Sequence, residues 1–295
     1  MAMPIIPLWA VLSLAASLLV TFIPLVQERF KADGFALALW NKVFVAAMIS
    51  PFLWRVGLPT DPLFYGFVTL TAAIFSLSDV VYFRAVPIIG SGLMTRLLPA
   101  SVVITFLLWF AVDPQLIDKY TAVPWKMAAI CAILLAFVFF ASRVKKCHIS
   151  WTGLRLIWPV IVAACIGPVL VKLALDHAAK EQATFAYLFF QSVLTIFFLS
   201  LYAAVKHPVP RRVLYSPHVI KVAALMGALM GSTMYLKTRA VALVDNPGFT
   251  SMIFFTDALW VILIYKLIGR KETGNIWAGL GIVACAAALV LVKSL

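Results

Sequence analysis

Residues 35–44 read FALALWNKVF, and residues 185–194 read FAYLFFQSVL, 150 positions further along the chain. Phe, Ala and Val recur in register between the two segments, and Asn41 in the first corresponds to Gln191 in the second. Three more pairs match in the same order: Trp9–Leu12 with Trp158–Ile161, Tyr82–Arg84 with Tyr235–Lys237, and Trp125 with Trp277. Four ordered matches indicate a duplicated unit, with a first repeat at residues 1–147 and a second at 148–295.

The composition indicates an integral membrane protein. The 295 residues are 64% hydrophobic and 12% charged, with a mean hydropathy of +1.05, whereas soluble domains are about 45–50% apolar and about 25% charged. Apolar runs of about 20 residues can cross a hydrocarbon core of about 30 Å. Ten such runs are predicted, near residues 4–26, 35–54, 63–83, 89–111, 124–142, 155–176, 184–205, 218–236, 248–267 and 275–293.

The number of spans in each repeat predicts how the halves are related. Because five is odd, the second repeat must enter the membrane from the side opposite to the first. We therefore expect an all-α integral membrane protein with ten transmembrane helices in two inverted-topology five-helix repeats. In that arrangement a substrate site lies near the bilayer midplane, between the halves.

Other classes of site find no support in the sequence. The cysteines stand at 131, 147, 165 and 285 without the spacing of a metal site or a disulfide framework, and the four histidines are scattered. There is no phosphate-binding glycine loop and no nucleophile elbow. We therefore expect no enzymatic activity, no catalytic residues, no cofactor and no metal.

The net charge of +13 does not indicate nucleic-acid binding, because Lys and Arg are spread over nearly every loop. The expected partners are the lipid bilayer and a small-molecule substrate, and a monomer is favoured. Of the 24 Lys and Arg residues, 14 lie in the loops after the first, third, fifth, seventh and ninth spans, and eight lie on the other side. By the positive-inside rule, this bias places both termini outside.

Several segments are similar to a known family of transporters. In the second half they are Ala240-Val241, Leu267–Gly269 followed by Glu272, and Trp277–Ile282; in the first half they are Tyr82–Val86 and Leu98-Pro99. With ten spans in two inverted halves, the chain resembles the drug/metabolite transporter superfamily, in particular its EamA-like ten-helix members. The resemblance implies a secondary transporter. It also implies cytoplasmic termini, against the Lys and Arg bias, so the orientation stays open.

Candidate site residues are the ionisable groups inside apolar spans, where each costs about 2.5–3.5 kcal/mol. Lys42, Asp79, Arg96 and Asp257 stand out, and Asp257 falls close to the midplane. Arg96 and Asp257 lie on repeat-related spans with opposite charge, so we expect them to form the charged centre. A zwitterionic substrate could bridge them, or Asp257 could carry a coupled proton. Alternatively, Asp257 forms a structural ion pair or is protonated and bonded to a neighbouring helix, and Arg96 reaches the interface or pairs with Asp79. Asp79 is then a solvated or interfacial carboxylate, and Lys42 reaches the headgroups.

Four uncharged polar residues complete the expected site. Asn41 and Gln191 occupy equivalent positions in the repeats, so both are expected to face a central cavity together with Tyr82 and Tyr235. The alternatives are interhelical hydrogen bonds for the two amides and an interfacial aromatic belt for the tyrosines.

The function expected from these features is secondary transport by alternating access. The substrate class is a small polar or amphipathic organic metabolite, such as an amino acid or nucleotide derivative, moved for export or exchange. The alternatives are a lipid or lipid-headgroup flippase, or a non-transporting membrane protein that handles lipid-linked intermediates. The expected location is the bacterial inner (plasma) membrane, which the chain crosses many times.

Overall fold

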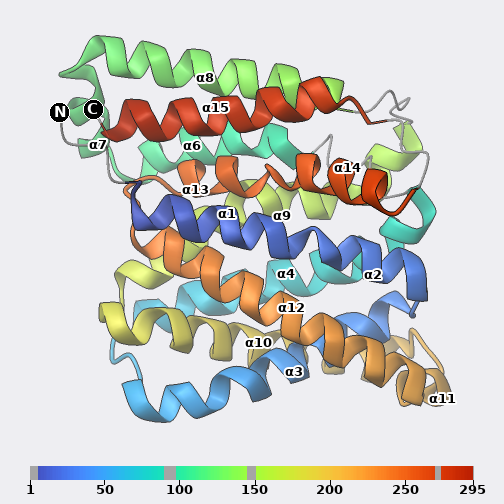
Figure 1. Ribbon diagram of the computed structural model, residues 1–295. Coiled ribbons are helices and arrows are strands. Elements are labelled where there is room, and N and C mark those ends of the chain that lie inside the picture. Colours follow the sequence, from blue (N-terminus) through green and yellow to red (C-terminus); the bar gives the residue numbers. More distant parts are fainter. Residues whose placement is uncertain (1–5, 90–97, 145–150, 270–273, 295) are drawn as a thin grey trace.

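The computed structural model describes residues 6–89, 98–144, 151–269 and 274–294, and every regular element in these ranges is a helix (Figure 1). The first half contains α1 (Leu8–Val20), α2 (Phe22–Phe30), α3 (Gly34–Val56), α4 (Pro62–Ile89), η1 (Leu98–Ala100), α6 (Ser101–Val112), α7 (Gln115–Thr121) and α8 (Pro124–Arg143). The second half contains α9 (Trp151–Asp176), α10 (Lys180–Lys206), α11 (Arg211–Leu214), α12 (Pro217–Ala242), α13 (Pro247–Phe254), α14 (Asp257–Leu267) and α15 (Ile276–Ser294).

Nine helical segments in the described ranges are long and apolar enough to cross a membrane. Two of them are composite, because α1 continues into α2 and α13 continues into α14. The expected span at 89–111 lies partly outside the described residues. Its described part, Leu98–Val112, is followed by Gln115–Thr121 at an angle of 111°, and this bent pair is a tenth span only if its two parts are counted together. The inverted relation between the halves stays a prediction.

Both chain termini lie at one end of the helical bundle, which we call the terminal end (left in Figure 1). The connections 57–61, 113–114, 177–179 and 243–246 also belong to this end, because each joins helices that run to it and back. Helix α11 and the end of α2 mark the opposite end (Figure 1).

Helices from the two halves pack against each other throughout the bundle. In particular, α4 lies on α9, α3 lies on both α10 and α12, and α1 lies on α12. The contact between α3 and α12 is close because Gly227 has no side chain: a Cβ atom there would lie 2.5 Å from the Cβ of Phe44. The halves therefore form one folded unit around a shared interior.

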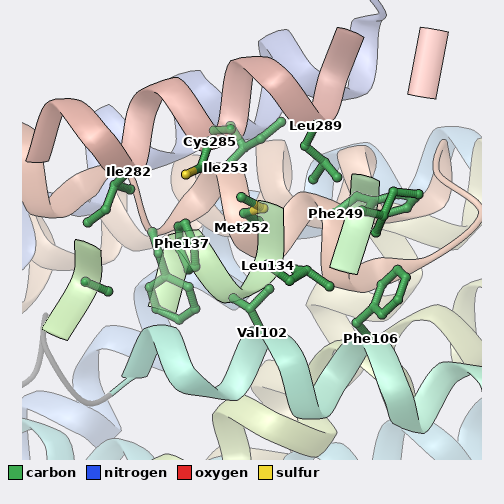
Figure 2. Packing of buried hydrophobic residues seen from close by; sticks show 14 of the residues in the cluster. Val102, Phe106, Leu134, Phe137, Phe249, Met252, Ile253, Ile282, Cys285 and Leu289 are labelled. Carbon is green, nitrogen blue, oxygen red and sulfur yellow. The ribbon is translucent and has the colours of Figure 1, made fainter. Parts of the chain in front are cut away.

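The largest apolar cluster lies on one side of this interior, where α6, α8, α13 and α15 meet. Figure 2 shows Phe106, Phe137 and Phe249 from three of these helices directed into the cluster. All three side chains are almost fully buried. Helix α13 is therefore anchored in this cluster, and α14 begins three residues after its last residue.

Candidate functional site

A cavity of about 240 Å³, which we call the central cavity, is lined by residues of α1, α2, α3, α4, α9, α10, α12, α13 and α14. Its charged and phenolic lining residues are Lys42, Asp79, Tyr82, Tyr187, Lys237 and Asp257. Asp257 lies ten residues after Pro247, the first residue of α13, which corresponds to about 15 Å along a helix. This is half of a hydrocarbon core of about 30 Å, so Asp257 lies near the middle of the span that α13 and α14 form.

The first pair of charges in the cavity is bonded within the protein. Lys42 lies on α3 and Asp79 on α4, and their Nζ and Oδ2 atoms are 2.9 Å apart. The Lys42 side chain is only 1% exposed. A buried ammonium requires a counter-ion, so Lys42 is held in the interior by Asp79. The alternative in which Lys42 reaches the headgroups does not describe this arrangement, and the alternative in which Asp79 pairs with Arg96 falls on a residue outside the described ranges.

The second pair of charges is arranged differently. Lys237 on α12 places its Nζ 4.0 Å from the centroid of the Phe254 ring, which is a cation–π contact. Asp257 begins α14, and its Oδ1 atom is buried without a hydrogen-bond partner among the residues that the structure describes. Both residues line the cavity, and within the described ranges no ion pair joins them.

Asp257 lies at a break in the span that α13 and α14 form. Helix α13 ends at Phe254, and the hydroxyl of Thr256 lies 2.8 Å from the hydroxyl of Ser17 on α1. A carboxylate in the first turn of a helix is favoured by the helix dipole. The sequence therefore places an acid where a half-helix begins inside the membrane, which is a common position for ligand sites in transporters.

Lys237 was not among the expected site residues. The apolar run predicted at 218–236 ends one residue before it, so Lys237 was counted with the loops, whereas α12 continues to Ala242. A helical signal was present in the sequence, because Met230, Met234, Lys237 and Val241 follow one another at spacings of four, three and four. This spacing places them on one face of a helix, and all four line the cavity.

Asn41 and Gln191 do not line the cavity. Both are fully buried in helix packing. Gln191 donates a hydrogen bond of 3.0 Å from Nε2 to Thr195 Oγ1 on its own helix, and both polar side-chain atoms of Asn41 are buried without a partner. The reason is helical geometry, because adjacent residues of a helix point about 100° apart. Since Lys42 faces the cavity, the side chain of Asn41 points away from it into the packing between helices.

The two tyrosines expected at the site are separated by the fold. Tyr82 lines the cavity, whereas Tyr235 packs against Phe185, with the ring centroids 5.2 Å apart. Arg96 lies outside the described residues, so the expected contact between Arg96 and Asp257 stays a prediction. Of the expected site residues, the structure thus brings together Lys42, Asp79, Tyr82 and Asp257.

A second, larger cavity of about 730 Å³ opens at the terminal end. We call it the vestibule; its charged lining residues are Asp113, Lys119, Lys172, Asp176, Lys180 and Asp245. On α9, Val171 lines the central cavity and the next residue, Lys172, lines the vestibule. On α12, Val241 lines the central cavity and Ala242 lines the vestibule. The two cavities are therefore neighbours along α9 and α12.

Ion pairs surround the vestibule. Lys172 and Asp176 form an i, i+4 ion pair, with Nζ and Oδ1 2.9 Å apart. Asp245 lies between two ammonium groups, 3.5 Å from Lys119 Nζ and 3.4 Å from Lys293 Nζ. Partial burial alone would raise the pKa of Asp245, but the attraction of Lys293 and Lys119 outweighs it and leaves this pKa below its usual value.

At the opposite end of the bundle, two hydrogen bonds join helices that are distant in sequence. The Tyr265 hydroxyl on α14 donates to Glu28 Oε2 on α2. The indole nitrogen of Trp40 donates to the carbonyl oxygen of Leu214 at 2.8 Å, which joins α3 to α11. In the described ranges, no group of three His, Cys, Asp or Glu side chains could hold a metal ion at either end or between them.

No family model matches the sequence, and no curated protein resembles it significantly. The resemblance to the drug/metabolite transporters therefore rests on the sequence motifs and on the expected pattern of spans.

Proposed function

We propose that this protein is a secondary transporter that moves a small polar or amphipathic organic metabolite by alternating access, for export or exchange. The observation that carries the proposal is the central cavity, in which Lys42, Lys237, Asp79 and Asp257 line one space inside a bundle of apolar helices. Such groups are costly in an apolar bundle, and they usually mark a substrate or ion path.

The two ends of the bundle support the same function. The vestibule adjoins the central cavity at the terminal end, whereas α2 and α14 are joined at the opposite end through Glu28 and Tyr265. We interpret this arrangement as a state that is reached from the terminal end. A second state, with the Glu28–Tyr265 contact broken and the vestibule closed, completes the cycle.

The proposal also includes the family and the location. Membership in the drug/metabolite transporter superfamily is supported by the sequence motifs, and the bacterial inner membrane is the location that such a transporter implies. The flippase alternative remains a competing proposal, because most of the side chains around the four charges are apolar, including Phe75, Phe254 and Phe255. Lipid tails could occupy such a surface.

The test is cysteine accessibility, which requires no knowledge of the substrate. In a background with the four native cysteines replaced, Ser78→Cys and Met234→Cys each place a thiol in the cavity wall. A membrane-impermeant thiol reagent should label both positions in right-side-out and in inverted vesicles. Asp118→Cys, exposed at the terminal end, should be labelled in one orientation only.

Two outcomes contradict the proposal. Cavity cysteines that react from one side only would exclude alternating access. Rapid transfer of a fluorescent phospholipid between leaflets of proteoliposomes, abolished by Asp257→Asn, would identify a flippase instead.

A further inference from the structure

Of the four charges in the central cavity, Lys42 and Asp79 form an ion pair, whereas Lys237 and Asp257 form none within the described ranges. Lys42 and Asp79 neutralise each other at 2.9 Å. Lys237 and Asp257 line the same cavity, and within the described part of the chain neither of them forms an ion pair. A charged ligand can therefore bind Lys237 or Asp257 without breaking an ion pair, whereas binding to Lys42 or Asp79 would require breaking theirs.

Asp257 lacks a hydrogen-bond donor at Oδ1. This oxygen is buried, and no group in the described ranges donates a hydrogen bond to it. Buried polar atoms in folded proteins nearly always have a partner, and a missing partner is destabilising. A ligand ammonium group would supply both the hydrogen bond and the opposite charge.

Lys237 is held in a way that leaves its donors available. Its Nζ lies 4.0 Å from the centroid of the Phe254 ring, and a ring face attracts a cation without accepting its N–H groups in strong hydrogen bonds. Because Phe254 lies three residues before Asp257 in the sequence, this contact keeps the ammonium near the start of α14. A ligand carboxylate could then accept charge-assisted hydrogen bonds from it.

The volume and the remaining lining restrict what can lie between the two groups. About 240 Å³ is available, which is less than the common range of about 300–1,000 Å³ for ligand pockets. The side chains near the charges include Phe75, Met234 and Phe255, so the body of the ligand is apolar.

We propose that Lys237 and Asp257 are the substrate-binding charges of this protein and that the substrate is an α-amino acid with an apolar side chain. Its carboxylate binds Lys237 and its ammonium binds Asp257. A zwitterion leaves both residues paired, whereas a simple anion or cation leaves one of them unpaired. The proposal rests on the transport function proposed above and names the substrate class of the same cavity.

Binding to the purified protein in detergent tests this assignment. The probes are L-leucine, L-methionine and L-phenylalanine, each compared with its amide, which lacks the carboxylate, and with its N-acetyl derivative, which lacks the ammonium. At least one free amino acid should raise the melting temperature in a concentration-dependent way, because a ligand that binds only the folded state stabilises it. The amide and N-acetyl forms of that amino acid should bind at least tenfold more weakly.

Substitutions then test the two residues separately. Lys237→Met and Asp257→Asn should each weaken binding of the free amino acid at least tenfold. In Asp257→Asn, the N-acetyl derivative should bind about as well as the free amino acid. The protein then has no carboxylate at position 257 that the ligand's ammonium group could pair with. The loss of discrimination between these two ligands distinguishes a binding role from a folding defect, which would weaken both ligands and keep their ratio. Lys221→Met on the exposed part of α12 and Asp118→Asn are matched controls and should bind as the unmodified protein does.

The assignment is overturned if no probe raises the melting temperature, or if Lys237→Met and Asp257→Asn bind all probes like the unmodified protein. Neither result affects the accessibility of Ser78→Cys and Met234→Cys from both sides of the membrane. The failure of this inference and the failure of the proposed transport function are therefore distinguishable.

Discussion

Lys42 on α3 and Asp79 on α4 form an ion pair of 2.9 Å that lines the central cavity. The two residues are unequally covered, since the side chain of Lys42 is 1% exposed and that of Asp79 is 17% exposed. Without its partner, the Lys42 ammonium would be shielded from water, whereas the Asp79 carboxylate would still be partly solvated.

The first prediction follows from this inequality. Asp79→Asn should destabilise the protein by up to about 3–5 kcal/mol, because it leaves the buried Lys42 ammonium without a counter-ion. The double substitution Lys42→Met with Asp79→Asn should recover much of that loss. Thermal unfolding of the four proteins in detergent provides the double-mutant cycle. Equal stability of Asp79→Asn and the unmodified protein would show that Lys42 has another partner.

The second prediction concerns the two amides at equivalent positions in the repeats. Since Asn41 and Gln191 are fully buried away from the cavity, Asn41→Cys and Gln191→Cys should remain unlabelled by a hydrophilic thiol reagent. Ser78→Cys in the cavity wall should be labelled under the same conditions, in the same cysteine-free background. Labelling of Asn41→Cys, with protection by substrate, would instead restore that residue to the site.

The third prediction compares two glycines on α12. A Cβ at Gly227 would lie 2.5 Å from the Cβ of Phe44, close to the backbone of α3, whereas at Gly231 the nearest atom is the terminal methyl of Met48. Gly227→Ala should therefore destabilise the fold by about 1–3 kcal/mol. Gly231→Ala should be close to neutral, because the methionine can move and alanine favours the helix by about 0.5–1 kcal/mol. Melting temperatures in detergent measure both, and equal effects would contradict the close α3–α12 contact.

The fourth prediction is a pH dependence at the terminal end. Asp61 accepts a 2.9 Å hydrogen bond from the backbone N–H of Leu63, and its Oδ2 lies 2.7 Å from His177 Nδ1. The Leu63 bond, followed by the His177 bond, lowers the pKa of Asp61 below its usual value of 3.8. The lowered pKa means that the ionised form stabilises the folded state above about pH 4 and that this contribution is lost as the pH falls through the folded pKa.

Asp61→Asn should therefore melt at a lower temperature than the unmodified protein at pH 6, and the difference should shrink below pH 4. Asp118→Asn is the control, because Asp118 is exposed, and it should show no comparable convergence. A difference that stays constant from pH 6 to pH 3 would rule out the lowered pKa.

The positions of most spans could be predicted from the sequence, because the apolar length needed to cross a bilayer is a local property. The runs at 35–54 and 124–142 correspond to α3 at Gly34–Val56 and α8 at Pro124–Arg143. Local hydropathy did not reveal the helix α7 after Asp113 or the break between Phe254 and Asp257. Both depend on contacts with other helices, such as the one between Thr256 and Ser17.

The candidate site was predictable in part for the same reason. Lys42, Asp79 and Asp257 were singled out because an ionisable group in an apolar run is unusual wherever it points, and all three line the cavity. Asn41 was assigned to the cavity from the repeat alone, but the rotation of α3 about its axis is fixed by packing on α10 and α12. Lys237 was missed because the end of α12 extends beyond its apolar run.

The sequence by itself determined that the chain is a helical membrane protein with costly charges inside its spans, because burial in hydrocarbon selects residues one segment at a time. Only the tertiary structure decided which charges neutralise each other. Lys42 meets Asp79 from another helix, whereas Lys237 meets the ring of Phe254 and leaves Asp257 Oδ1 unbonded. Electrostatic and hydrogen-bond energies depend on distances of a few ångströms between helices, and no spacing along one chain segment contains those distances.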